Sequence, residues 1–135
     1  ELVPAELTYG LERLAMYVQD VDHFTKIRWN NPKNSADQVY YGDLFFQQEK
    51  ELSAYSLEHA DVDIVLRTFR DAEAECKALL KKDLPLVAYH QALTACHHFN
   101  LLDARGALNV TERASYMAKV RGLVKECCLK WMESQ

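Results

Sequence analysis

The chain has 135 residues, of which 49% are hydrophobic and 27% are charged, and these proportions suit one ordinary globular domain. A formal net charge of -4 argues against a dedicated nucleic-acid-binding protein, because such proteins usually carry a basic excess. The four cysteines form no C-x-x-C pair and we expect no secretory leader, which favours free thiols over a disulfide framework or a zinc site. No apolar run approaches the roughly 20 residues that cross a bilayer, so we expect a soluble, cytoplasmic protein that does not enter membranes.

The first segment predicts a strand that turns into a helix. Residues 7–9 (Leu-Thr-Tyr) are typical of the end of a strand, and Gly10 provides a turn. A helix over residues 11–21 would place four apolar residues on one face: Leu11, Leu14, Ala15 and Val18. Because the chain begins with Glu1 rather than Met, we expect it to be cut from a longer protein, and a strand without its neighbours would have an unpaired edge.

The next segment predicts a connection between two parts of the chain. Residues 22–29 favour a further turn or a short helix. Residues 30–37 (Asn-Asn-Pro-Lys-Asn-Ser-Ala-Asp) are rich in turn formers. We therefore expect a linker over residues 30–42.

The remainder predicts a small helical bundle, because few Gly and Pro residues interrupt apolar residues at three-and-four spacing. The expected helices cover residues 43–57, 61–82 and 85–106, followed by a last helix from residue 110. Asp43 and Asp61 suit helix starts, Pro85 suits a first turn and Gly106 suits a helix end. The fold class is thus mainly α, with a short strand and helix ahead of the bundle.

The last helix carries a capping signal and an apolar stripe. Asn109 and Glu112 have the spacing of a capping box. We interpret the stripe as core packing rather than as a membrane or cofactor surface. Its members are Val110, Ala114, Met117, Val120, Val124, Cys127 or Cys128, and Trp131.

Five sequence blocks indicate a family. The run Glu6-Leu-Thr-Tyr-Gly-Leu-Glu-Arg-Leu-Ala-Met-Tyr17 resembles the third signature motif of the class II aminoacyl-tRNA synthetases. Four later blocks, over residues 41–49, 55–63, 99–106 and 110–113, resemble the bacterial-type glycyl-tRNA synthetase alpha subunit. The resemblance covers about residues 5 to 132 and is to the C-terminal part of that subunit. Thr8 and Glu6 depart from the small residues that the general class II pattern favours before the Glu-Arg pair.

The resemblance implies a domain division and a reaction. Residues 1–29 would be the C-terminal end of a class II catalytic domain, residues 30–42 a linker and residues 43–135 a helical C-terminal domain. The parent protein would be a glycine-tRNA ligase, which makes glycyl-adenylate from glycine and ATP and then transfers the glycyl group to tRNA(Gly). Mg²⁺ would bridge the ATP phosphates, and the partner would be the beta subunit or a fused beta region. The rest of the active site would lie upstream, so we expect the isolated fragment to be inactive and to bind no cofactor alone.

Arg13 is the leading candidate site residue, because a guanidinium is a permanently charged planar fork for phosphate oxygens. By resemblance, Arg13 would be catalytic and bind an ATP phosphate, Gly10 would let the nucleotide approach the backbone, and Glu12 would support the arginine or the helix start. The alternative from the residues alone is a surface ion pair at a helix N-terminus.

The other candidates have structural alternatives that we favour. Lys119, Arg121, Lys125 and Lys130 could touch tRNA phosphates, but a solvated helix face is the simpler interpretation. The acidic residues Glu49, Glu51, Glu58, Asp61 and Asp63 read as a charge-balanced face rather than a metal site. Cys96, His97 and His98 lack the spacing of zinc ligands, and His59 suits a local hydrogen bond. We expect no metal site.

A competing function is a non-catalytic helical interaction module that binds a partner protein or tRNA. In that case Glu12 and Arg13 would merely begin a helix. Arg105 and Arg113 flank the turn before the last helix, and we expect them to tie it together through Asp103 or Glu112, with a contact to the beta subunit as the alternative.

Overall fold

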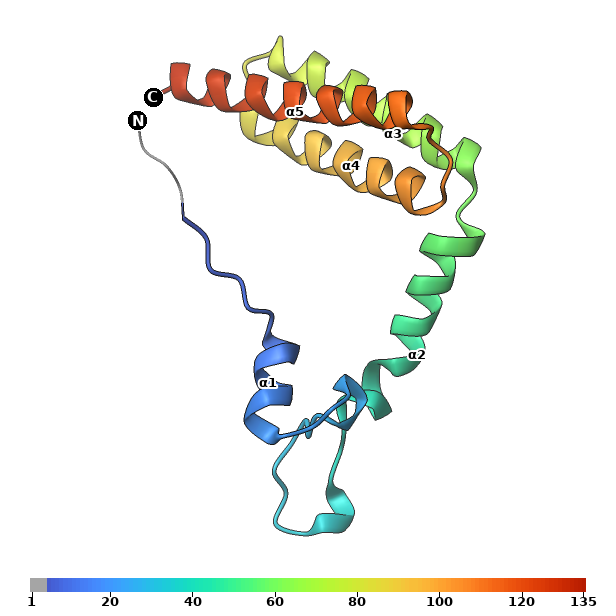
Figure 1. The fold of residues 1–135 in the computed structure, drawn as a ribbon. Helices are drawn as coiled ribbons and strands as arrows, with labels where there is room; N and C mark the ends of the chain where they lie inside the picture. Colours follow the sequence, from blue (N-terminus) through green and yellow to red (C-terminus); the bar gives the residue numbers. More distant parts are fainter. Residues whose placement is uncertain (1–4) are drawn as a thin grey trace. The chain divides into compact units, whose positions relative to one another are not determined.

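The computed structural model describes residues 5–135, and these are mainly α-helical (Figure 1). The expected mainly α class is therefore confirmed. The chain divides into two compact units between Leu52 and Ser53. Within the described residues, none of the helices is both long and apolar enough to span a bilayer.

The first unit begins with an irregular segment and helix α1, Leu11–Gln19. The strand expected over residues 7–9 does not form, because no other segment of residues 5–135 pairs with it. Helix α1 ends two residues before the expected position, since Asp20 adopts the left-handed conformation with φ 52°. The backbone N–H of Val21 then closes the turn on the carbonyl of Met16 at 3.0 Å.

The segment after α1 folds into a closed loop that contains two short 3-10 turns, η1 (Phe24–Lys26) and η2 (Ser35–Asp37). An antiparallel bridge joins Arg28 to Tyr40. The Asn30 side chain closes the loop by accepting from the N–H of Val39 at 2.8 Å and donating to the carbonyl of Asp37 at 3.0 Å. The residues predicted as a linker thus hydrogen-bond within the first unit, and their role as a domain boundary stays a prediction.

Helix α2, Tyr41–Ala54, follows the loop directly. The carboxylate of Asp43 accepts from the backbone N–H of Tyr40 at 2.8 Å, so Asp43 lies in the first turn rather than before it. An aromatic cluster packs here, with ring centroids of Trp29 and Phe45 5.2 Å apart and those of Tyr41 and Phe45 4.8 Å apart. Aromatic pairs at such distances are favourable.

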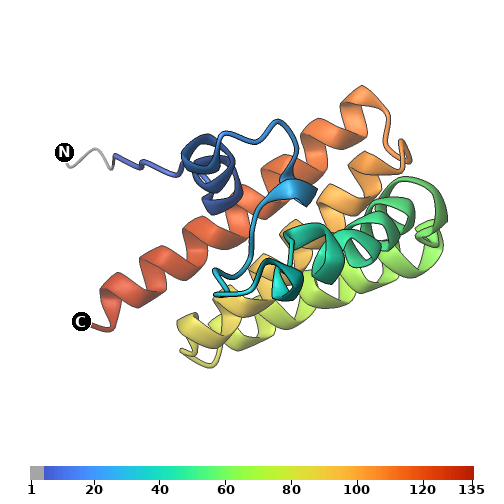
Figure 2. The same cartoon turned by 90° about the horizontal axis from the view of Figure 1, so that it is seen from below.

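A single π-helical turn, η3 (Tyr55–His59), leads into the second unit. The three long helices of this unit are α3 (Val62–Leu80), α4 (Pro85–Ala104) and α5 (Val110–Glu133). They lie side by side, and α4 contacts both of the others (Figures 1 and 2).

The helix ends of the second unit follow the capping signals of the sequence. The carboxylate of Asp61 accepts from two backbone N–H groups of the first turn of α3. Asn109 and Glu112 form the expected capping box at the start of α5. Pro85 begins α4, and Gly106 has φ 62° just beyond its end. These local predictions are confirmed, because caps depend on residues close in sequence.

The core of the second unit is a layer of large side chains packed over small ones. Helix α4 contributes alanines, which allow α3 and α5 to approach its backbone closely. The rings of Phe69 and Tyr116 meet edge to face with centroids 4.7 Å apart. The main cluster comprises Phe69, Ala72, Cys76, Leu80, Ala88, Ala92, Ala95, Phe99, Val120, Leu123 and Cys127.

The apolar stripe predicted on α5 is only partly buried. Val120 and Cys127 lie in the core as expected, and the core also includes Leu123. Val110 is 87% exposed and Trp131 is 45% exposed. Both residues lie near the ends of α5 and are not members of the core cluster.

Candidate functional site

The Gly-Leu-Glu-Arg motif forms the start of α1. Gly10 has φ 75° and ψ 128°, a conformation that side-chain-bearing residues rarely adopt. A Cβ added there would meet no atom within 4 Å, so glycine is needed for its conformation rather than for space. No side chain caps this helix end, and the first-turn N–H groups of a helix have no partner within the helix.

Arg13 is exposed on the first turn of α1. Within residues 5–135, no carboxylate pairs with its guanidinium, and Glu12 does not hydrogen-bond to it. The surface ion pair considered as the alternative is thus not formed with any described residue. The exposed N–H groups and the positive end of the helix dipole lie at the same end of α1 as this arginine.

Glu12 lies beside the aromatic cluster. It lines a hollow together with Leu11, Ala15, Ile27, Trp29, Tyr41 and Phe45. Partial burial, followed by the negative charges of Glu49 and Glu12, raises the pKa of the Tyr41 phenol. The motif and the start of α2 therefore line the same hollow, and Tyr41 is a residue that the sequence analysis did not single out.

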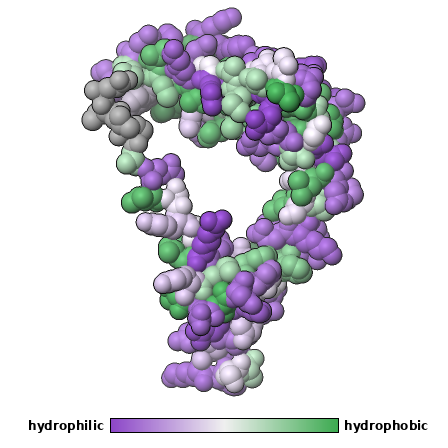
Figure 3. Space-filling model, in the orientation of Figure 1, coloured by the Kyte–Doolittle hydropathy of each residue, from purple (hydrophilic) through white to green (hydrophobic). Residues whose placement is uncertain are grey.

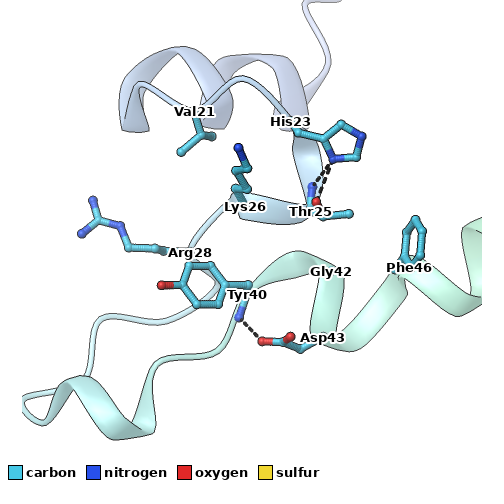
Figure 4. Close-up of a pocket in the computed structure, with 9 residues that line it drawn as sticks. All are labelled: Val21, His23, Thr25, Lys26, Arg28, Tyr40, Gly42, Asp43 and Phe46. Carbon is cyan, nitrogen blue, oxygen red and sulfur yellow. Dashed lines mark hydrogen bonds between the residues drawn. The ribbon is translucent and has the colours of Figure 1, made fainter.

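A second hollow of the first unit contains none of the predicted site residues (Figure 4). Its lining comes from the segment after α1 and from the start of α2: Val21, His23, Thr25, Lys26, Arg28, Tyr40, Gly42, Asp43 and Phe46. Lys26 is held by Asp22 at 2.7 Å, and this hydrogen bond and the lysine charge lower the pKa of Asp22. The bridge between Arg28 and Tyr40 brings the two lining segments together. No local sequence pattern predicts such a pairing.

The four basic residues predicted as tRNA contacts do not share one face of α5. At 100° per residue, Lys119 and Lys130 fall on one side and Arg121 and Lys125 on the other. Lys119 Nζ lies 3.8 Å from Glu73, and Lys130 Nζ lies 2.7 Å from Asp83. The hydrogen bond to Asp83 raises the pKa of the Lys130 ammonium. These two lysines therefore join α5 to α3 and to the turn after it.

The two arginines near the last turn behave differently. Arg113 pairs with Asp103 at 2.9 Å, as predicted. Arg105 instead donates to the carbonyl oxygens of Leu57 at 2.7 Å and Ala60 at 3.1 Å, and so ties α4 to the π-helical turn. The unusual carbonyl arrangement of that turn could not be read from the sequence.

The acidic residues and histidines that were considered as metal or acid-base sites make local contacts in the described part of the chain. Within residues 5–135, no group of three or more His, Cys, Asp or Glu side chains is arranged to hold a metal ion. Asp61 is engaged as the cap of α3. His98 Nδ1 lies 2.8 Å from the carbonyl oxygen of Thr94, and His59 lies 3.8 Å from Glu58.

Comparison with known proteins identifies the family. The family model described as "Glycyl-tRNA synthetase alpha subunit" matches residues 1–135. The chain belongs to the glycyl-tRNA synthetase alpha subunit family. It is 47% identical over 133 residues to the glycine-tRNA ligase alpha subunit of Rickettsia bellii (strain OSU 85-389), an alignment that covers 98% of this chain and 46% of the relative.

Other family members give the same proportions. The glycine-tRNA ligase alpha subunit of Rickettsia prowazekii (strain Madrid E) is 45% identical over 131 residues, covering 97% of this chain and 45% of the relative. That of Rickettsia akari (strain Hartford) is 47% identical over 131 residues, with the same coverage. The chain thus spans about half the length of these alpha subunits, and the resemblance inferred from the sequence blocks is confirmed.

Proposed function

We propose that this chain is part of a cytoplasmic glycine-tRNA ligase, which activates glycine with ATP to glycyl-adenylate and transfers the glycyl group to tRNA(Gly). The observation that carries the proposal is membership of the alpha subunit family over the whole chain. The relatives are named glycine-tRNA ligase alpha subunits. Because the chain covers 46% of such a relative, the complete activity belongs to a longer protein.

Arg13 would be the residue of this chain that acts on ATP. Its guanidinium is exposed and is not neutralised by a described carboxylate, so it is available to phosphate oxygens. The uncapped N-terminus of α1 adds partial positive charge at the same place. Gly10 would allow the nucleotide to approach the backbone, and Glu12, which lines the aromatic hollow, would support the helix start.

The reaction needs positioning and charge stabilisation rather than a protein nucleophile. The glycine carboxylate attacks the α-phosphorus of ATP, and pyrophosphate leaves. A fixed cation such as Arg13 stabilises the negative charge that develops on the phosphate oxygens. Mg²⁺, when bound to the intact enzyme, would supply further positive charge that stabilises the phosphate oxygens. Since residues 5–135 contain no suitable ligand cluster, we assign no Mg²⁺ ligand to this chain.

The test is the Arg13→Ala variant of the intact ligase, assayed by glycine-dependent exchange of pyrophosphate into ATP. We expect a loss of about 10²- to 10³-fold, the usual effect of removing one group that stabilises transition-state charge. Arg13→Lys keeps the charge but loses the planar fork, so an intermediate loss is expected.

The matched control is Arg70→Ala, which removes an exposed arginine from α3 of the second unit. It should leave the exchange rate unchanged, and all variants should retain the circular dichroism and melting curve of the parent. An Arg13→Ala enzyme with full exchange activity would show that this arginine does not act on ATP.

The second unit would hold the beta region or tRNA rather than take part in the chemistry. An apolar groove between α4 and α5, lined by Leu86, Tyr89, Trp131 and Met132 among others, favours a protein contact. The exposed Arg121 and Lys125 are the remaining candidates for contacts with tRNA phosphates.

Capture of the 135-residue chain by the beta region and by tRNA, repeated over a salt series, separates these roles. Contacts to phosphate weaken steeply with salt, whereas apolar contacts do not. Binding to neither partner would contradict both roles.

A further inference from the structure

Two cysteine thiols face each other in the core of the second unit. The Sγ atoms of Cys76 on α3 and Cys127 on α5 lie 3.9 Å apart, and both residues are buried. A disulfide needs an S–S distance of about 2.05 Å, so the two sulfurs have about 2 Å to close. The other two thiols lie elsewhere: Cys96 is half-buried and Cys128 is exposed.

The pair can be reached from the surface through an apolar groove. Cys127 lines this groove together with Leu86, Tyr89, Trp131 and Met132, and its walls are almost entirely apolar. Such walls admit an uncharged molecule more readily than a charged one, because a charge entering them loses its hydration. Cys76 does not line the groove and is completely buried.

We propose that Cys76 and Cys127 form an oxidation site, at which an uncharged two-electron oxidant entering through the α4–α5 groove converts the thiol pair into a disulfide. The inference concerns the second unit alone and does not rest on the proposed ligase activity. With diamide as the oxidant, the Cys127 thiolate adds to the N=N bond, and the other nitrogen takes a proton. Cys76 then attacks the Cys127 sulfur, the S–N bond breaks and the hydrazine leaves. Two thiols lose two electrons and two protons, and the azo group gains them.

The bond would join the two helices that contact each other least. Helices α3 and α5 both pack mainly on α4 rather than on each other. The disulfide would close a loop between residues 51 positions apart and would prevent α5 from separating from α3. Burial raises the pKa of Cys76 to about 12, so the resting pair stays protonated and reacts slowly until a reactive oxidant enters.

The experiment uses the 135-residue chain with Trp29→Phe, Cys96→Ser and Cys128→Ser, which leaves only the proposed thiol pair and the tryptophan of the second unit. Diamide should yield a monomer lower in mass by two hydrogens, with Cys76 and Cys127 peptides linked in a non-reducing digest. The thermal midpoint followed by Trp131 fluorescence should rise by roughly 10 °C and return after dithiothreitol. Oxidised glutathione, which is charged, should be slowed by folding about tenfold more than diamide is, each rate being compared with that of the same oxidant on the denatured chain.

Two controls make the result decisive. The further variant Cys76→Ser should form no intramolecular cross-link, and Trp131→Asp, which places a charge in the groove wall, should slow the diamide reaction severalfold. Absence of the cross-link in the folded chain would overturn the proposal. So would a cross-link that appears only in denaturant, or an equal slowing of diamide and oxidised glutathione by folding.

Discussion

The two units differ in what they do with their apolar residues. Within the described part of the first unit, Ile27 alone is buried, while Leu11 and Val18 of α1 are each 80% exposed. The second unit buries the apolar side of α3 completely at Phe69 and Cys76. Figure 3 shows apolar side chains interspersed with hydrophilic ones on the surface. Helical patterning thus identifies the apolar face that a helix can bury. It does not show whether the surface that packs on this face belongs to the same chain.

The difference predicts where stability comes from in each unit. The second unit is held by tertiary burial, which dominates the stability of helices in proteins. The first unit is held by loop hydrogen bonds, such as those of Asn30, and by aromatic contacts around Tyr41. Each unit contains one tryptophan, Trp29 and Trp131, so fluorescence of the Trp131→Phe and Trp29→Phe backgrounds reports on the two units separately.

The largest expected effect is that of Phe69→Ala. Removing this completely buried ring should lower the free energy of unfolding of the second unit by about 3–5 kcal/mol, because burial is lost and a cavity remains. The transition reported by Trp131 in a urea titration should move accordingly, and the one reported by Trp29 should stay in place.

The matched control for Phe69→Ala is Val18→Ala, on the exposed face of α1. It should change either transition by no more than about 0.5 kcal/mol. Equal shifts of both tryptophan signals by Phe69→Ala would show that the two units unfold together, and the comparison between them would fail.

Sequence reasoning succeeded where structure is decided locally. The caps at Asp61 and Asn109, the start of α4 at Pro85 and the left-handed Gly106 all depend on neighbouring residues. It failed where the structure depends on residues that are distant in the sequence. Residues 7–9 have β-strand character but no partner strand in the described chain. Arg105 donates hydrogen bonds to carbonyl oxygens that are more than 40 positions away in the sequence.

The candidate site shows the same division. The sequence predicted a turn at Gly10 followed by a helix with Arg13 in its first turn, and the structure has both features. The role of Arg13 on ATP stays a prediction. No sequence pattern predicted that Tyr41 lies in the same hollow as Glu12, because an irregular loop, rather than a periodic element, brings the two residues together.

A smaller effect should appear in the pH dependence of the second unit. Burial, followed by the charge of Cys127, raises the folded-state pKa of Cys76 to about 12, whereas the pKa of an unfolded thiol is about 8.5. Below the unfolded pKa this thiol adds no pH dependence. Above it, the unfolded state loses the proton that the folded state keeps, so the free energy of unfolding should fall by about 1.4 kcal/mol per pH unit.

The measurement is the slope of unfolding free energy against pH between about 9 and 11, followed by Trp131. Because lysines and tyrosines also titrate there, the informative quantity is the difference between variants. Cys76→Ala should flatten the slope, while Cys128→Ser, at an exposed thiol, should leave it unchanged. The charges of Lys77 and Glu126, which act on Cys76, are the same in both variants. A slope unaffected by Cys76→Ala would mean that the thiol is accessible to solvent.

The last comparison makes one substitution in both units, Gly42→Ala in α2 and Gly122→Ala in α5. A Cβ at Gly42 would lie 2.8 Å from Thr25 Cβ and 2.9 Å from the Thr25 carbonyl oxygen, so the start of α2 has to move away from η1. We expect a loss of about 1–3 kcal/mol in the transition reported by Trp29.

At Gly122 the added methyl group meets no atom within 4 Å, and the residue lies inside a helix. Alanine should therefore raise the stability reported by Trp131 by about 0.5–1 kcal/mol, because it restricts the unfolded chain more than glycine does. The two changes are chemically identical, so opposite signs can come only from the surroundings of each glycine. If Gly42→Ala also stabilised its unit, the close contact between Gly42 and Thr25 would not exist in solution, and the first unit would lack the packing that holds α2 to the loop.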